Sequence, residues 1–159
     1  MNLCDILNQG NVLLPLKSRS RGQVVQELLD HLHKMGHLSG TVKLHKHIQT
    51  EEENQSSATG RGIAYPHSKS IEIDGLVCIL GISQRGIDFN APDGQNCHFI
   101  LLTLIPNKGS VEHRKFINRF RAMINHGDIR TQFLDAKKAA QVLKVISKWE
   151  TQESQEEFE

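Results

Sequence analysis

The chain has 159 residues, of which 38% are hydrophobic and 23% are charged, so it is large enough for one globular domain with a buried core. Its formal net charge of +1 gives no reason to expect a nucleic acid or an anionic membrane surface as a partner. No apolar run is long enough to span a membrane, the N-terminus has no signal-peptide pattern, and three widely spaced cysteines indicate reduced thiols, so we expect a cytoplasmic protein.

The first part of the sequence predicts two short elements and then a helix. Apolar side chains within residues 3–7 indicate a short opening helix, and residues 11–14 indicate a brief extended segment. Ser20 is followed three residues later by Gln23, which is the spacing of a capping box. Apolar residues then recur at helical spacing, so we predict an amphipathic helix over residues 21–35.

The middle of the chain predicts a helix, a loop and then buried strands. A second helix is expected over residues 41–50, and the polar residues 51–62 are predicted to form a loop. Strands are predicted over residues 63–65, 76–82 and 98–105. The last two are almost continuous apolar runs, which is typical of strands covered on both faces.

The C-terminal part predicts a helical layer and an acidic tail. A helix is expected over residues 111–127, then a short helix, and a last helix over residues 136–149. The final ten residues hold five acids and no base, so we expect a domain of residues 1–150 and a disordered acidic tail of residues 151–159. Central strands with helices at both ends predict a single-domain α/β sandwich.

The stretch from Gly60 to Ser68 contains the first candidate functional residue. Its two glycines permit positive φ, and Pro66 fixes its own φ and favours an extended Tyr65. His67 therefore follows a short strand on a stiffened turn, where a neutral imidazole can act as a nucleophile at physiological pH. Judged from position alone, a turn histidine hydrogen-bonded to the backbone is the commoner case.

His113 is the second candidate. Ser110 is placed to cap the helix that begins near Val111, so His113 lies in the first helical turn. Free N–H groups at a helix N-terminus favour anions and disfavour imidazolium, so a neutral His113 can donate a hydrogen bond to a phosphate. His67 and His113 both follow buried strands, and a parallel or mixed sheet would bring them together. If the sheet does not bring the two histidines together, His113 is an ordinary surface residue of the helix.

A metal site is an alternative hypothesis for some of the nine histidines. His33 and His37 form an i,i+4 pair, and His31, His45 and His47 lie nearby in the sequence. No cysteine lies near these histidines, and histidines on polar helix faces are usually solvated. We therefore expect no bound metal.

Residues 56–67, whose sequence is SSATGRGIAYPH, carry a resemblance to a known family. They resemble the active-site segment of the fructose/mannitol-type (type 2) enzyme IIA domains of the bacterial phosphoenolpyruvate-dependent phosphotransferase system. That group includes the nitrogen-regulatory enzyme IIA proteins. The resemblance covers nearly the whole chain, including the loop of residues 106–110, Glu112-His113 and the closing helices, and it leaves out only the tail.

The resemblance implies a phosphoryl carrier with a mixed sheet flanked by helices. His67 would match the phosphorylated histidine, and His113 would match the histidine that hydrogen-bonds the phosphoryl group. The loop residues expected to support them are Ser57, Thr59, Gly60, Arg61, Gly62 and Pro66. The implied phosphoryl donor is a phosphohistidine on HPr or on a nitrogen-branch paralogue, and no cofactor is implied.

The partners that follow from the resemblance are proteins. The chain has no enzyme IIB-like domain and no membrane segment, so the phosphoryl group would pass to a separate enzyme IIB chain or report to a regulatory target. The free-standing form favours the regulatory role by analogy. The resemblance leaves a homodimer open.

The sequence departs from the family pattern at Glu51, where the family usually has an arginine, and around Ala58 and Thr59 in the loop. An arginine would supply positive charge to a phosphoryl group, whereas Glu51 supplies negative charge unless it points into solvent. Arg61 is a candidate to offset the loss. The alternative function is therefore a regulatory binding module that keeps the fold without being phosphorylated.

Overall fold

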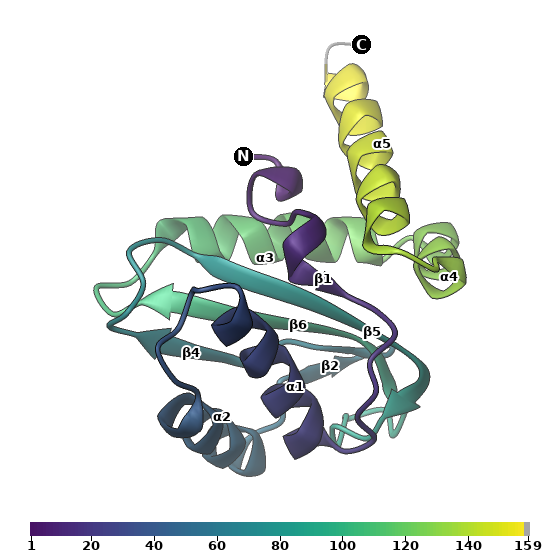
Figure 1. Cartoon of the computed structure of the whole chain (residues 1–159). Helices are drawn as coiled ribbons and strands as arrows, with labels where there is room; N and C mark the ends of the chain where they lie inside the picture. Colours follow the sequence, from purple (N-terminus) through teal and green to yellow (C-terminus); the bar gives the residue numbers. More distant parts are fainter. Residues whose placement is uncertain (158–159) are drawn as a thin grey trace.

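A computed structural model describes residues 1–157 and shows a six-stranded sheet (Figure 1). The strands are β1 (Val12–Leu13), β2 (Ala58–Gly60), β3 (Ile63–Ala64), β4 (His67–Ser70), β5 (Val77–Ile87) and β6 (Cys97–Pro106). Their order is β1-β5-β6-β3-β2, and β4 also pairs with β6. The β5–β6 and β2–β3 pairs are antiparallel, whereas the β1–β5, β3–β6 and β4–β6 pairs are parallel. The predicted α/β fold with a mixed sheet is confirmed.

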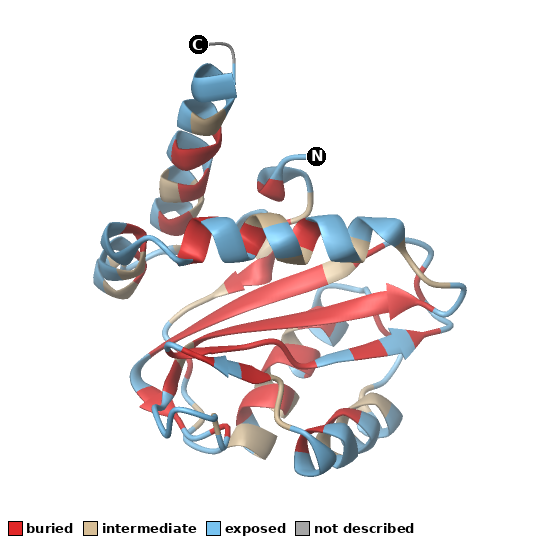
Figure 2. Ribbon diagram, turned by 180° about the vertical axis from the view of Figure 1, so that it is seen from behind, coloured by how far each residue is buried: buried red, intermediate tan, exposed pale blue. Residues whose placement is uncertain are grey.

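Helices cover both faces of the sheet. They are α1 (Arg21–Lys34), α2 (Val42–Asn54), α3 (Val111–Ile124), α4 (Gly127–Asp135) and α5 (Ala139–Glu157), with 3-10 turns at Leu3–Asp5 and Gln9–Asn11. In Figure 1, α1 and α2 lie on one face, and α3, α4 and α5 lie on the other. A buried apolar cluster lies on each side, so β5 and β6 are buried along most of their length (Figure 2). Within residues 1–157, no helix has the length and apolar character needed to cross a lipid bilayer.

The two-residue period of β6 decides which side chains meet which helical layer. Leu101 and Ile105 pack in the cluster beneath α3 and α5, while Leu102 and Leu104 pack in the cluster beneath α1. Thr103 shares the parity of Leu101 and Ile105 and is 1% exposed. Its hydroxyl is therefore a buried polar group in an apolar layer, where it needs a hydrogen-bond partner.

Two helix starts predicted from capping residues are confirmed. The Ser20 hydroxyl oxygen accepts the N–H of Gln23 at the start of α1, and the Ser110 hydroxyl oxygen accepts the N–H of His113 at the start of α3. The capping box of α1 is only half formed, because the Gln23 side chain accepts the N–H of Arg19 rather than that of Ser20. The opening helix and the extended segment correspond to the first 3-10 turn and β1.

The helix expected over residues 41–50 is longer than predicted. It continues to Asn54 and β2 follows, so the loop prediction over residues 51–62 is wrong for much of its length. Glu52 is 4% exposed, and its carboxylate accepts the N–H of Ser57 at 3.0 Å. This buried contact ties the last turn of α2 to the segment that enters β2. The sequence did not indicate this contact, because Glu52 stands in a run of three glutamates and nothing local shows that only the middle one is buried.

The C-terminal helices also differ from prediction. Asp135 ends α4, and α5 begins at Ala139 rather than at residue 136. α5 then continues to Glu157, so the segment expected to be a disordered tail is helical as far as the structure describes it. The remaining two residues of that predicted tail, 158–159, lie outside the described residues.

Glu150 explains why α5 does not end at the predicted place. Its side chain is 6% exposed and forms an ion pair with Arg119 of α3 at 2.8 Å. The same carboxylate accepts the N–H of Leu3 at 2.7 Å and the N–H of Cys4 at 3.2 Å. Glu150 therefore joins α5 to α3 and to the N-terminal 3-10 turn, which fixes this part of the helix.

Candidate functional site

The pairing of β4 with β6 places His67 beside Thr103. The two strands are parallel, and His67 is the register partner of Thr103. Paired residues of neighbouring strands point to the same face, so the His67 side chain faces α3, as Thr103 does. Tyr65 has the same parity and packs in the buried cluster beneath α3. His67 is the first residue of β4 and lies three residues after the end of β3. The sequence predicted His67 just after a strand over residues 63–65, which is close to this position.

His113 meets this pair from the first turn of α3. Its Nε2 lies 3.2 Å from the hydroxyl oxygen of Thr103. The ring centroids of His67 and His113 are 6.2 Å apart, and the two ring planes are inclined by 40°. The fold therefore brings together the two histidines that the sequence singled out, with the buried Thr103 hydroxyl contacting the second.

A hydrogen bond determines the tautomer of His67. Its Nδ1 lies 3.1 Å from the carbonyl oxygen of Tyr65. A carbonyl oxygen only accepts hydrogen bonds, so Nδ1 carries the proton of the neutral ring and Nε2 holds the free lone pair. The His67 side chain is exposed, which lets a partner reach it. Nε2 is therefore the unprotonated nitrogen of this exposed ring.

The environment of His113 favours the neutral ring. Desolvation of the half-buried imidazole lowers the pKa of His113, and the charge of His67 lowers it further. A neutral imidazole has one donor nitrogen and one acceptor nitrogen. Nε2 contacts the Thr103 hydroxyl, so Nδ1 is the second ring nitrogen and carries the proton when that hydroxyl donates to Nε2.

Three successive residues have positive φ where the chain passes from the end of β2 into β3. The φ values are 95° at Gly60, 62° at Arg61 and 81° at Gly62. Glycine adopts this conformation readily and arginine does not, so the loop needs outside support. Asp93 supplies it, because its carboxylate accepts the N–H of Arg61 at 2.8 Å, and this bond lowers the pKa of Asp93. The Arg61 guanidinium donates to the Asn125 side chain at 3.0 Å, at the end of α3.

The other predicted loop residues hold the segment that leads to His67. The Ser57 hydroxyl oxygen accepts the N–H of Tyr65 at 3.1 Å. The Pro66 carbonyl accepts the N–H of Thr103 at 3.0 Å, which joins the residue before His67 to β6. Thr59 is exposed and borders the cavity over the histidines. These contacts fix the backbone that carries His67.

A cavity of about 580 Å³ lies over the two histidines. Tyr65 and His67 line its base. One wall, which we call the α3 wall, consists of His113, Ile117 and Arg121. These three residues are spaced four apart, so they share one face of α3. Ile48, Glu51 and Glu52 from the end of α2 form a second wall, the α2 wall.

Glu51 belongs to the α2 wall. It borders the cavity over the histidines and also a second cavity of about 670 Å³, which His67 and His113 border as well. Although exposed, Glu51 therefore lies beside the two histidines rather than away from them. Arg61 borders neither cavity, and its guanidinium is held at Asn125. This placement gives no support to the idea that Arg61 offsets the charge of Glu51.

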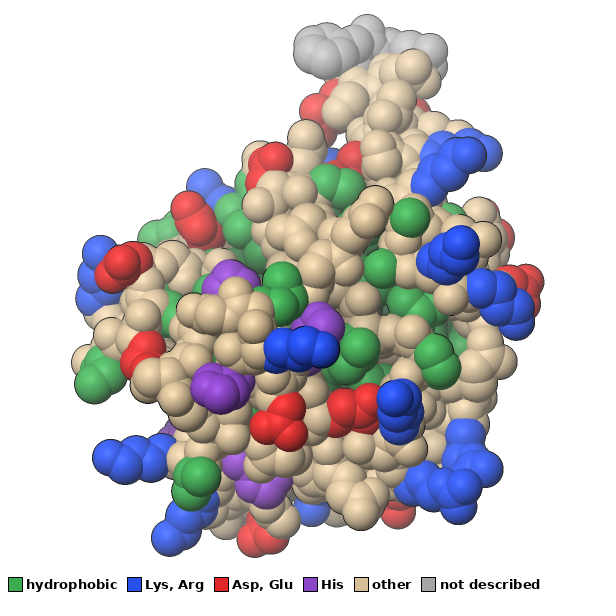
Figure 3. All heavy atoms as spheres, in the orientation of Figure 1, with side chains coloured by type: hydrophobic (Ala, Val, Ile, Leu, Met, Phe, Trp, Pro, Cys, Tyr) green, Lys and Arg blue, Asp and Glu red, His purple; other side chains and the backbone are tan. Residues whose placement is uncertain are grey.

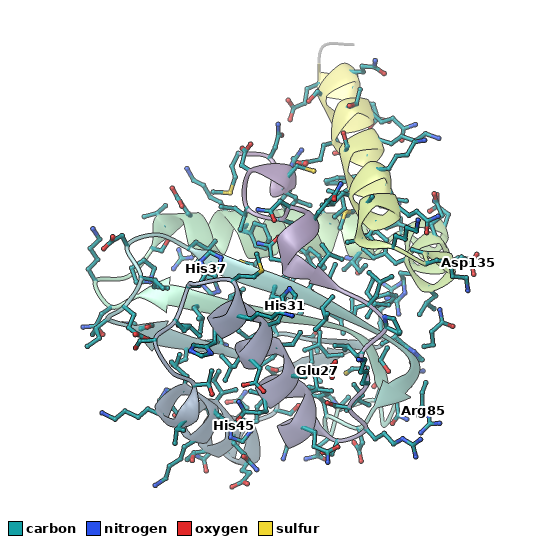
Figure 4. The ribbon with its side chains drawn as sticks, viewed as in Figure 1. Glu27, His31, His37, His45, Arg85 and Asp135 are labelled. Carbon is teal, nitrogen blue, oxygen red and sulfur yellow. The ribbon has the colours of Figure 1, made fainter. Side chains whose placement is uncertain are left out.

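The histidines of α1 and α2 are spread out rather than gathered. The Nε2 of His31 lies 2.7 Å from the Gly10 carbonyl, and that of His45 lies 2.9 Å from the Gly22 carbonyl. Figure 3 shows separate histidine side chains among acidic and basic ones, and the histidines labelled in Figure 4 lie apart, with His31 on α1, His45 on α2 and His37 just after the end of α1. Within the part of the chain that the structure describes, no group of three or more His, Cys, Asp or Glu side chains is arranged to hold a metal ion.

Sequence reasoning missed three residues that border the histidines or hold their backbone. Thr103 carried a signal, because it is the one hydroxyl residue in an apolar strand. Asp93 lies between β5 and β6, and its contact with Arg61 depends on the fold. Arg121 lies on the predicted helix of residues 111–127, but nothing local distinguishes it from the other basic residues of that helix.

The fold and the paired histidines define a class of protein. The family model described as "Phosphoenolpyruvate-dependent sugar phosphotransferase system, EIIA 2" matches residues 5–149. The chain belongs to this family, which confirms the resemblance found in its sequence.

Individual relatives agree with this assignment. The chain is 26% identical over 149 residues to a nitrogen regulatory protein of Bradyrhizobium diazoefficiens, covering 92% of this chain and 95% of that protein. It is 24% identical over 147 residues to the fructose-specific EIIABC component of Bacillus subtilis, covering 92% of this chain but only 23% of that longer protein. The crystal structure of nitrogen regulatory protein IIA-Ntr from Neisseria meningitidis has the same fold, with a TM-score of 0.79 at 20% identity over 89% of this chain and 97% of that one.

Proposed function

We propose that the protein is a phosphoryl carrier that accepts a phosphoryl group on Nε2 of His67. The observation that supports this most directly is the hydrogen bond from His67 Nδ1 to the Tyr65 carbonyl, which leaves Nε2 unprotonated and exposed. The neighbouring His113 is the donor that hydrogen-bonds the phosphoryl oxygens. Membership of the EIIA family supports phosphoryl transfer as the reaction class.

The chemical step is a transfer between two imidazoles. The Nε2 lone pair of His67 forms a new N–P bond while the N–P bond of the donor phosphohistidine breaks, and the electron pair of that bond returns to the donor imidazole. The His67 ring gains positive charge because Nδ1 keeps its proton. The hydrogen bond from Nδ1 to the Tyr65 carbonyl strengthens as this charge develops, which stabilises the phosphorylated ring.

The donor and acceptor of the phosphoryl group are other proteins in the cytoplasm. We propose phosphorylated HPr or a nitrogen-branch paralogue as the donor. The acceptor is a separate enzyme IIB chain, or the phosphorylation state reports to a regulatory target. One structural neighbour, enzyme IIAMTL from Escherichia coli, was solved in a complex with phosphorylated enzyme IIBMTL, which supports the first type of acceptor.

The test is phosphorylation from phosphoenolpyruvate through enzyme I and HPr, with the donors shown to be active on a known carrier. We expect acid-labile phosphate on the wild type and none on His67→Ala. A His31→Ala variant is the matched control, since it removes a histidine that lies outside the cavity. Absence of label on the wild type, or equal label on His67→Ala, would contradict the proposal.

A second candidate is a regulatory binding module that is not phosphorylated. The observation that favours it is Glu51, whose carboxylate borders the same cavity as His67 and would repel a phosphoryl group. The phosphoryl carrier and the binding module predict different results when the wild type and Glu51→Gln are tested for phosphorylation. If no phosphorylation occurs in the wild type but Glu51→Gln restores it, the carboxylate blocks the reaction and the binding module is the correct function.

A further inference from the structure

We propose that Arg121 is a further catalytic residue of this site, whose guanidinium contacts the phosphoryl group on His67. This inference rests on the proposed function. A phosphoryl group brings close to two negative charges into the cavity. Arginine is well suited to such a group, because its planar guanidinium offers several donors in fixed geometry together with a permanent charge.

The charged side chains that line the cavity single out Arg121 as the group that can bind an anion. Among the described residues that line it, Arg121 is the one lysine or arginine, and Glu51 and Glu52 belong to the α2 wall; Lys43 and Lys69 border the second cavity only. The Glu52 carboxylate accepts a backbone N–H. Within residues 1–157, the one side-chain ion pair joins Arg119 to Glu150, so no described carboxylate neutralises Arg121. Its positive charge is therefore available to a ligand.

The geometry of α3 directs Arg121 toward the histidines. Arg121 lies eight residues after His113 on the same helix face, which is about 12 Å along the helix axis. Side chains on a helix lean toward its N-terminus, so the long side chain of Arg121 covers part of the distance back to His113. Ile117 lies between them and also borders the cavity, which keeps this face continuous.

Tyr65, which lies two residues before His67, holds the guanidinium over its ring. The Cζ atom of Arg121 lies 4.9 Å from the centroid of the Tyr65 ring, which is cation–π geometry. That ring packs edge-on against Phe120, with centroids 6.3 Å apart, so its position is fixed by the core. The carbonyl oxygen of the same tyrosine accepts the Nδ1–H of His67. One residue therefore positions both the nucleophile and the cation.

Two measurements test the assignment. The first follows the rate of phosphorylation and the lifetime of the phosphohistidine in the wild type, Arg121→Gln, Arg121→Lys and Arg85→Gln. Arg85 is an exposed residue of β5, outside the cavity, and its replacement removes the same charge (Figure 4). We expect about a tenfold loss of rate and a shorter lifetime in Arg121→Gln, a partial loss in Arg121→Lys, and wild-type values in Arg85→Gln.

The second measurement needs no donor protein. Inorganic phosphate is titrated into each variant while the imidazole NMR signals of His67 and His113 are recorded. We expect Arg121→Gln to weaken phosphate binding about tenfold, and Arg85→Gln to leave it unchanged. Tyr65→Leu should weaken binding as Arg121→Gln does, whereas Tyr65→Phe, which keeps the aromatic ring, should retain it.

The outcomes separate this inference from the proposed function. If Arg121→Gln equals Arg85→Gln in phosphate affinity and phosphohistidine lifetime, the assignment of Arg121 is overturned while labelled His67 still supports the carrier. If the wild type takes no label from active donors, the carrier is overturned, and a tenfold weaker phosphate affinity in Arg121→Gln still assigns Arg121 to anion binding. Absence of any phosphate-induced shift in the wild type overturns the assignment.

Discussion

The two walls of the cavity over His67 carry opposite chemistry. The α3 wall offers a neutral donor, His113, and a cation, Arg121, whereas the α2 wall offers the carboxylates of Glu51 and Glu52. Only the first kind of group stabilises a phosphoryl group directly. In the proposed carrier, the groups that stabilise the phosphoryl group would therefore come from α3, whereas α2 contributes structure through Glu52 and an opposing charge through Glu51.

The largest effect is expected on the α3 wall, from His113→Ala. Removing the hydrogen-bond donor beside the phosphoryl group should lower the transfer rate about a hundredfold. The rate is measured by single-turnover phosphorylation with purified donor. Asn118→Ala on the exposed face of the same helix is the control, and circular dichroism checks that the fold is kept. A wild-type rate in His113→Ala would remove this histidine from the mechanism.

On the α2 wall, the largest expected effect is on stability rather than rate. Glu52→Ala removes a buried acceptor and leaves the Ser57 N–H without its partner, so it should lower the free energy of unfolding by about 1–3 kcal/mol. The neighbouring Glu53→Ala, at an exposed position, should stay within about 0.5 kcal/mol of the wild type. Urea denaturation measures both. Equal stability of the two variants would show that the Glu52 contact contributes nothing.

Thr103→Val tests whether the α3 wall needs its buried support. Valine keeps the shape but loses the hydroxyl that contacts Nε2 of His113, so the tautomer and orientation of this ring are no longer fixed. We expect about a tenfold lower transfer rate with normal affinity for the donor protein. The Nε2 and Nδ1 chemical shifts of His113 report the change in tautomer. Unchanged shifts would contradict the positioning role.

The elements predicted correctly from the sequence depend on short-range interactions. The starts of α1 and α3 follow from Ser20 and Ser110, whose hydroxyl oxygens accept N–H groups three residues later. The buried strands follow from continuous apolar runs. The pairing of His67 with His113 was expected because both follow such strands, and the family resemblance gave the same pair.

The features that the sequence did not predict depend on contacts between distant segments. The buried position of Glu150 requires Arg119 and the N–H groups of Leu3 and Cys4, which lie across the chain from it. An isolated glutamate in an acidic segment carries no local sign of these partners. The same holds for the placement of Arg121 over Tyr65, since the two meet only when α3 packs on the sheet.

A smaller effect on the transfer rate is expected when a positive charge replaces the negative charge of Glu51 on the α2 wall. Glu51→Arg replaces a carboxylate beside His67 and His113 with a guanidinium, so phosphoryl acceptance should become about three- to tenfold faster. Glu51→Gln, which only removes the negative charge, should produce a smaller increase. Single-turnover rates and phosphohistidine lifetimes measure both. Unchanged values in both variants would show that the Glu51 charge does not reach the site.

The smallest effect concerns the titration of His113. Desolvation and then the charge of His67 lower its pKa below 6.5, so His67→Gln should raise the pKa of His113 without restoring 6.5, because desolvation remains. Asn118→Ala on the exposed face of α3 is the control and should leave the pKa of His113 unchanged. NMR titration of the imidazole Cε1–H signals measures both variants.

The lowered pKa of His113 also predicts how the free energy of unfolding changes with pH. Below pH 6.5 the unfolded chain binds a proton at His113 before the folded protein does. The contribution of His113 to stability is therefore complete above pH 6.5 and is lost as the pH falls toward the lower folded-state value. His113→Gln should flatten this part of the pH profile of the unfolding free energy. A profile equal to that of the wild type would mean that the ring titrates alike in both states, and that the α3 wall does not hold His113 neutral.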